Sequence, residues 1–298
     1  MQSFARGFAV LAAAVLVILG ALHAQVAAPQ VPVPSPPTVI FAVKTTYIGD
    51  NPPTATIDPV VVMDGATLGK PPERGRQKKP GPGFVRFTRT YYESGRTYPL
   101  LMGGVARGML TVEKPVAAGC SATAAVKLPI MTPRGDMALA ATSSERFGLH
   151  SRYRNHALPK QRVVFQKLAA SYLQQNGVAE VPLASLHIDS VYATKWRAND
   201  PDSLVGNLIF KNAAGVHYVF LVATKDGDTF SVAFATHYTA KNDDDPSVTR
   251  ESFVDQLDFD HDGVDEIVTM LSHGKSWEYA IYKMEDGTWQ KIYQGGGC

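Results

Sequence analysis

Short segments in which Val, Ile, Thr and aromatic residues alternate with polar residues recur along most of the chain, and this alternation predicts β-strands. Gly-containing turns separate the segments, which favours antiparallel sheets or a small barrel. In the N-terminal half the predicted strands are 38–48, 57–63, 84–92, 97–102, 109–113 and 122–130. In the C-terminal half they are 205–211, 216–223, 229–238, 266–271, 277–284 and 288–293.

Two dipeptides predict where consecutive strands form hairpins. Asp226-Gly227 and Asp286-Gly287 each lie between two predicted strands, and Asp-Gly at such a position is a strong hairpin signal. The strand 229–238 also carries apolar residues on one alternating face: Phe230, Val232, Phe234 and Tyr238. The C-terminal half is therefore predicted to be an antiparallel sheet with an aromatic-rich face.

One segment has the spacing of a helix, from about 159 to 176. Pro159 is acceptable in a first helical turn, and Asn176-Gly177 is a typical stop signal. Between them the apolar residues recur at intervals of three and four: Val164, Phe165, Leu168, Tyr172 and Leu173. The predicted fold is mainly β of the α+β kind, with a small N-terminal antiparallel β domain, one long helix packed on a sheet, and a C-terminal antiparallel β sheet.

Residues 1–28 have the pattern of a secretory signal peptide. Arg6 precedes the apolar run 8–22, and small residues follow at the expected cleavage region. The apolar run is shorter than the roughly 20 residues that span a bilayer, so we expect cleavage and no stable membrane insertion afterwards. The mature chain is predicted to be secreted or periplasmic and to begin with a Pro-rich linker at 29–37.

Composition divides the rest of the chain into three regions. An N-terminal β domain at 38–135 contains a basic, Pro-rich loop at 70–83, a connecting region follows at 136–190, and the C-terminal β domain occupies 191–298. The basic loop fits either an anionic partner such as a cell-surface polymer or a solvated surface loop, and the second is preferred because no aromatic residues interleave with the bases. The formal net charge of +2 gives no reason to expect nucleic-acid binding.

The chain has two cysteines, Cys120 and Cys298. In an oxidising compartment they could form one disulfide, which would contribute up to about 4 to 5 kcal/mol by closing a long loop in the unfolded chain. Two free thiols are the alternative. Neither cysteine has the spacing of a zinc site or of a C-x-x-C redox motif.

The segment 258–266 carries the pattern of a cation-binding loop. Asp258, Asp260 and Asp262 alternate along the chain, and Gly263 follows them, where a loop that wraps around one point must turn sharply. Val264 can offer its carbonyl and Glu266 another carboxylate. Oxygen ligands in this number favour Ca²⁺ over Zn²⁺ or copper, and Mg²⁺ is the weaker candidate. The stretch 243–266 contains ten acidic residues and a single base, Arg250, and carboxylates crowded in this way repel one another unless a cation binds or some pKa values rise.

This loop is not an EF-hand, because Thr269 stands where the last ligand should be and both flanks, 253–257 and 267–271, have strand character. The acidic pattern followed by Ile267-Val268 resembles the FG-GAP or VCBS repeat, a blade of integrin-like β-propellers. The resemblance covers about one blade, through the hairpin that ends near 293, and a degenerate copy near 195–206. It implies Ca²⁺ held by side chains of Asp258, Asp260, Asp262 and Glu266 and by the carbonyl of Val264.

Recognisable catalytic motifs are missing: there is no H-E-x-x-H, G-x-S-x-G or G-x-G-x-x-G sequence. We therefore expect a non-enzymatic, calcium-stabilised protein that binds another protein or a cell-surface polymer, or has a structural role. The alternative is an exported hydrolase of carbohydrate or cell-wall polymer that uses Asp255 or Asp265 as acid and base. In that case four aromatic residues could stack on sugar rings, although core packing is the commoner role: Trp277, Tyr279, Trp289 and Tyr293.

Overall fold

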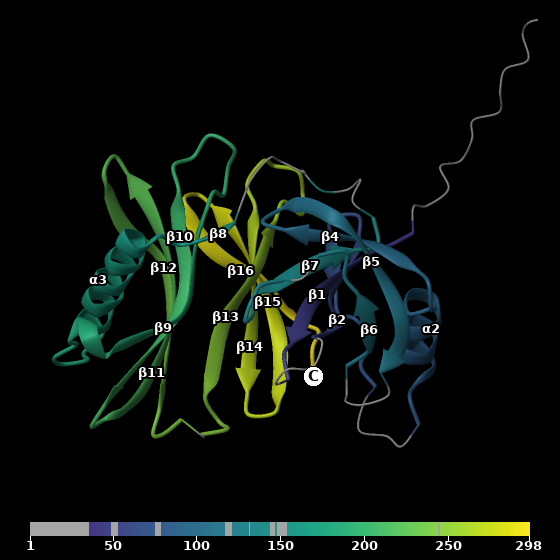
Figure 1. Ribbon diagram of the computed structural model, residues 1–298, viewed down its shortest axis with the longest axis horizontal. Helices are drawn as coiled ribbons and strands as arrows, with labels where there is room; N and C mark the ends of the chain where they lie inside the picture. The colour runs from purple at the N-terminus through teal and green to yellow at the C-terminus, as the bar shows by residue number, and fades with distance from the viewer. Residues whose placement is uncertain are drawn as a thin grey trace, which may run out of the picture. The chain divides into compact units, whose positions relative to one another are not determined.

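A computed structural model describes residues 36–48, 53–74, 79–116, 121–130, 132–143, 147, 154–243 and 245–298. Residues 37–298 form one compact unit that contains three antiparallel sheets and, among the described residues, two α-helices (Figure 1). The predicted mainly β fold is thus confirmed. The predicted signal peptide 1–28, most of the linker 29–37 and Cys120 lie outside the described residues. Among the helices that are described, none is long and apolar enough to cross a membrane.

The first sheet closes into a six-stranded barrel. Its strands run in the order β1-β7-β4-β5-β6-β2, and β1 pairs back onto β2, with β3 added beside β2. The bounds are β1 Thr38–Thr46, β2 Thr54–Asp64, β3 Thr67–Gly69, β4 Thr97–Met102, β5 Val105–Val116, β6 Thr123–Lys127 and β7 Met137–Ala141. Val39, Phe41 and Val43 belong to one core cluster, whereas Ile40 and Ala42 belong to another. The barrel wall is therefore apolar on both sides.

The predicted strand 84–92 is wrong, because this segment is helix α2 (Pro82–Tyr91). Pro82 stands in the first turn, where its missing N–H costs nothing. Phe84, Phe87 and Tyr91 follow at a helical spacing and pack against the core that contains Phe41. In a strand the same sequence would mix aromatic and polar side chains on each face. The prediction gave weight to β-branched and aromatic composition when the period of the pattern indicated a helix.

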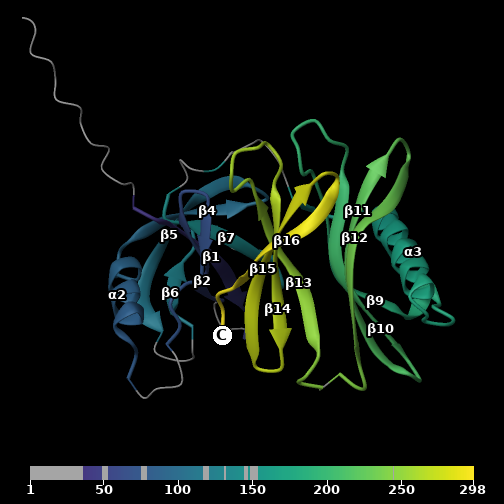
Figure 2. The same cartoon turned by 180° about the vertical axis from the view of Figure 1, so that it is seen from behind.

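The second sheet has the order β12-β11-β10-β9-β8, and the predicted helix is confirmed as α3 (Pro159–Gln175), which packs on it (Figure 2). The bounds are β8 Asn155–His156, β9 Leu186–Thr194, β10 Ser203–Asn212, β11 Gly215–Asp226 and β12 Thr229–Ala240, with a short 3₁₀ helix at Leu183–Ser185. Phe165 and Leu173 of α3 are fully buried in one cluster with Leu204 and Leu221 of the sheet.

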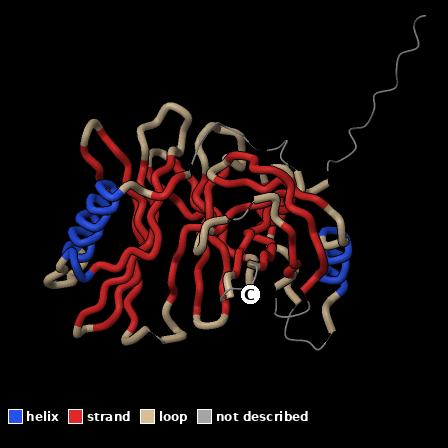
Figure 3. The backbone as a smooth tube through the Cα atoms, viewed as in Figure 1, coloured by secondary structure: helices blue, strands red, loops and turns tan. Residues whose placement is uncertain are grey.

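The third sheet is a four-stranded meander in chain order: β13 (Thr249–Leu257), β14 (Glu266–His273), β15 (Ser276–Glu285) and β16 (Thr288–Gly295). Both of its faces are covered. Val254 and Ile281 pack in the cluster that contains the outer face of the barrel, whereas Phe253 and Ala280 pack with side chains of the second sheet. The tube drawing shows how strands dominate this arrangement (Figure 3).

The second and third sheets repeat one design. In each, four consecutive strands form a meander, and an eight-residue loop joins the first two of these strands, 195–202 in one sheet and 258–265 in the other. The last hairpin has a two-residue turn in both sheets. In the third sheet the turn is Asp286-Gly287 as predicted, whereas in the second sheet Asp226 pairs with Thr229 and the turn lies one residue later than predicted, at Gly227-Asp228. The last strand then carries its bulge at the same place, with Ala233 and Ile292 each four residues after the strand begins.

Candidate metal centre

The acidic loop 258–265 is anchored in two separate cores. Phe259 is buried in the cluster shared with the barrel, where its ring lies edge-on to Phe147. Val264 is buried in the other cluster, between the second and third sheets. Because the two apolar side chains enter cores on opposite faces of the third sheet, the short acidic segment between them is fixed at both ends.

Three carboxylates converge within this loop. Asp258, Asp260 and Asp262 each place one oxygen within 4.8 Å of the oxygens of the other two. Two oxygens bound to one Ca²⁺ at about 2.4 Å can lie at most about 4.8 Å apart, so this arrangement fits a single calcium ion. Asp258 is buried, and Asp260 and Asp262 are exposed. The three aspartates that the sequence identified are thus brought together by the fold.

Backbone hydrogen bonds shape the loop around these carboxylates. The N–H of Gly263 donates to Asp258 Oδ2 at 3.1 Å, and the N–H of Val264 donates to Asp262 Oδ1 at 2.8 Å. Gly263 has a φ of 84°, the left-handed conformation that glycine adopts without strain. Glu266 is the first residue of β14, and its Oε2 accepts a hydrogen bond of 2.8 Å from the N–H of Phe259.

A lysine that the sequence analysis did not single out lies against the same carboxylates. Lys283 extends from β15, and its Nζ is hydrogen-bonded to Asp260. It lies 2.9 Å from Asp262 Oδ2 and 3.8 Å from Glu266 Oε1. Lys283 thus contacts three of the four acidic side chains expected to bind metal, and its ammonium group neutralises only part of their charge.

These contacts shift the pKa values of the cluster. Burial raises the pKa of Glu266 to about 8, against the opposing effect of the Phe259 N–H. For Asp262, burial raises the pKa, but the hydrogen bonds from Lys283 and from the N–H of Val264, together with the positive charge of Lys283, outweigh burial and the net shift is downward. The crowding of carboxylates is therefore relieved partly by an ammonium group and partly by protonation, and a bound divalent cation would relieve it further.

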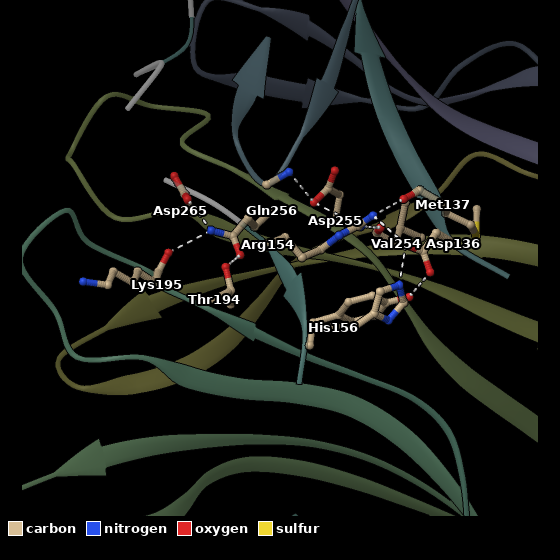
Figure 4. Close-up of polar contacts among 12 residues, drawn as sticks. Asp136, Met137, Arg154, His156, Thr194, Lys195, Val254, Asp255, Gln256 and Asp265 are labelled. Carbon is tan, nitrogen blue, oxygen red and sulfur yellow. Dashed lines mark hydrogen bonds and ion pairs between the residues drawn. The ribbon is translucent and has the colours of Figure 1, made fainter. Parts of the chain in front are cut away.

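The loop is also hydrogen-bonded to its counterpart in the second sheet (Figure 4). The N–H of Asp265 donates to the carbonyl of Trp196 at 2.8 Å. Gln256 Nε2 donates both to Asp265 Oδ2 at 2.7 Å and to the carbonyl of Lys195 at 2.8 Å. A cavity of about 320 Å³ borders the other side of the loop, lined by Met63, Leu68, Phe259, Asp260, His261 and Ile292 among others.

A buried arginine joins all three sheets close to this loop (Figure 4). The guanidinium of Arg154 donates to the carbonyls of Met137 in β7 and Val254 in β13, each at 2.9 Å. It lies 3.3 Å from a carboxylate oxygen of Asp255 and stacks over the Tyr192 ring of β9 at 4.8 Å. The second sheet thus shares one buried cation with the barrel and the third sheet.

The two acids of the hydrolase alternative are inaccessible. Asp255 and Asp265 are 0% and 1% exposed. Asp255 accepts the N–H of Gly103 at 2.9 Å, and burial raises its pKa to about 6 despite Arg154 nearby. Three of the aromatic residues considered for sugar stacking are also buried: Tyr279, Trp289 and Tyr293. Their role in the described structure is core packing.

Comparisons with family models, with curated proteins and with solved structures find no significant match to the chain. The site's three converging aspartates were recognisable from their spacing. Lys283 carries no such signal, because it lies on β15 and meets the loop only through strand pairing.

Proposed function

We propose that this chain is a secreted or periplasmic, non-enzymatic protein whose C-terminal region is a calcium-stabilised FG-GAP-like β module. Its role is to bind a protein or cell-surface polymer or to serve as a structural element. The observation that carries the calcium proposal is the convergence of Asp258, Asp260 and Asp262 within 4.8 Å. Glu266 and the carbonyl of Val264 complete the proposed ligand set.

The position of the loop supports a stabilising role for the ion. Phe259 and Val264 fix the loop in two cores, and Asp265 ties it to the second sheet. A cation that holds the carboxylates between these anchors would oppose the separation of all three sheets. The two similar meanders support the FG-GAP-like assignment, since a blade of that family is a four-stranded antiparallel sheet.

The test compares thermal unfolding in about 10 mM Ca²⁺, in Mg²⁺ and in excess EGTA. With a Kd of about 10⁻⁴ M, calcium contributes about 2.7 kcal/mol. The expected rise in Tm is about 5 to 10 °C in Ca²⁺ alone. Asp260→Asn should abolish it, and the control Asp228→Asn, at an exposed hairpin turn, should leave it unchanged. No calcium-specific rise in the unsubstituted protein would contradict the proposal.

A further inference from the structure

Two histidines face each other on the surface of the second sheet that packs against α3. His217 lies on β11 and His237 on β12, and Nδ1 of His217 is 3.0 Å from Nε2 of His237. His217 alternates with Val219 and Leu221, which belong to the core beneath α3. The pair therefore lies on the face turned away from the third sheet and the acidic loop.

An oxygen donor completes a triangle with these nitrogens. Thr239 Oγ1 lies 3.4 Å from His217 Nδ1 and 3.4 Å from His237 Nε2. Thr239 is exposed and His237 is half-buried, so solvent reaches the triangle from one side. Three potential metal-ligand atoms from two adjacent strands thus meet at one accessible point.

The surroundings hold both rings in place and keep them neutral. Phe210 stacks on His217 with ring centroids 5.7 Å apart, and Tyr172 of α3 lies edge-on to His237 at 6.4 Å. Burial lowers the pKa of both histidines, and the neighbouring His217 adds to the effect on His237. Each neutral imidazole has one lone pair that a transition metal can bind. Without metal, one of the two nitrogens carries the proton of the hydrogen bond between the rings, so metal binding would move that proton to the other nitrogen of the same ring.

The polar contacts of His217 are all on the side of this triangle. Its Nε2 is buried and has no hydrogen-bond partner among the described residues. Its Nδ1 contacts both His237 and Thr239. Nδ1 therefore makes the polar contacts of this ring, and it is the nitrogen that a shared metal ion would use.

The separation of the nitrogens indicates which ion fits. With metal–nitrogen bonds of about 2.1 Å, two nitrogens 3.0 Å apart subtend about 90° at the ion. That angle belongs to tetragonal sites of nitrogen and oxygen ligands, typical of Cu²⁺ and Ni²⁺, whereas tetrahedral Zn²⁺ needs nitrogens about 3.3 Å apart. We propose that His217, His237 and Thr239 form a second metal site, for Cu²⁺ or Ni²⁺, with water as the remaining ligands.

This site is independent of the proposed calcium loop, because imidazole nitrogen binds copper and nickel whereas carboxylate oxygen suits calcium. The experiment is calorimetric titration of the purified protein with Ni²⁺ in saturating Ca²⁺, which occupies the carboxylates if they bind it. His237→Gln should weaken Ni²⁺ binding by at least about tenfold, since loss of even an outer-shell partner can cost that much. The control is His187→Gln, which removes a single exposed histidine of β9.

Electron paramagnetic resonance with Cu²⁺ provides a readout that does not depend on affinity. The unsubstituted protein and His187→Gln should both show coupling to two imidazole nitrogens, and His237→Gln should lose one. Equal Tm values in a chelator would show that His237→Gln is folded. Absence of Ni²⁺ binding, or equal binding in His237→Gln, would overturn the proposal. Calcium-dependent melting tests the acidic loop separately.

Discussion

Replacing Lys283 by Met removes the ammonium group that contacts the carboxylates predicted to bind Ca²⁺. The four-carbon stem, which is partly buried, is largely kept, and only the charge is lost. In the calcium-free protein the ammonium partly neutralises Asp260, Asp262 and Glu266. A divalent cation at the same carboxylates must displace these contacts, so Lys283 and Ca²⁺ compete.

The size of the effect follows from the exposure of the partners. The side chain of Lys283 is 19% exposed, and those of Asp260 and Asp262 are 40% and 37% exposed. Ion pairs this open to solvent each contribute about 0.2 to 1 kcal/mol, so two of them oppose calcium by about 0.4 to 2 kcal/mol. Since about 1.4 kcal/mol is a tenfold change in Kd, Lys283→Met should tighten Ca²⁺ binding about two- to thirty-fold.

Calorimetric titration with Ca²⁺ measures this change directly. In EGTA the same substitution should lower the free energy of unfolding by about 1 kcal/mol, because the carboxylates then repel one another without the ammonium. Lys291→Met, on the exposed face of the neighbouring strand β16, is the control and should change neither quantity. Calcium binding that is unchanged or weaker in Lys283→Met would refute the competition. Absence of binding in every variant would refute the calcium site itself.

Three further outcomes are expected. Because burial raises the pKa of Asp255 to about 6, the stability that its protonated form contributes is full below about pH 4 and is lost as the pH rises through about 6. Asp255→Asn should remove this pH dependence, which is worth up to about 3 kcal/mol of unfolding free energy. Urea unfolding at pH 4 and pH 7 measures it, and an unaltered pH dependence in Asp255→Asn would contradict the reasoning. Arg154→Met leaves two buried carboxylates without their cation and should cost about 3 to 5 kcal/mol in urea unfolding, whereas a loss below about 1 kcal/mol would contradict the assigned role. If Cys120 and Cys298 pair, thiol reagents should label them only after reduction, and labelling of the unreduced, unfolded protein would exclude the disulfide.

Local patterns predicted the elements that depend on a few neighbouring residues. The hairpin at Asp286-Gly287 formed as expected, with both residues at positive φ, because the turn geometry is decided by these two residues. The helix 159–176 was recognisable because its apolar period, from Val164 to Leu173, extends over nearly three turns. The segment 84–92 misled the prediction because it is short and rich in residues that also favour strands. The brief strands β7 and β8 were missed, since pairing partners distant in the sequence hold them in place.

The sequence by itself determined the alternation that makes this a β protein and the Asp258, Asp260 and Asp262 spacing that places three carboxylates in one turn. Both follow from geometry within a few residues. Tertiary structure decided that Lys283 meets those carboxylates and that His217 meets His237. Strand register sets both contacts, since Lys283 and Asp260 are 23 residues apart in the sequence and the two histidines are 20 apart. Tertiary structure also placed the acidic loop among three sheets, since the cores that receive its apolar side chains draw on segments from the whole chain.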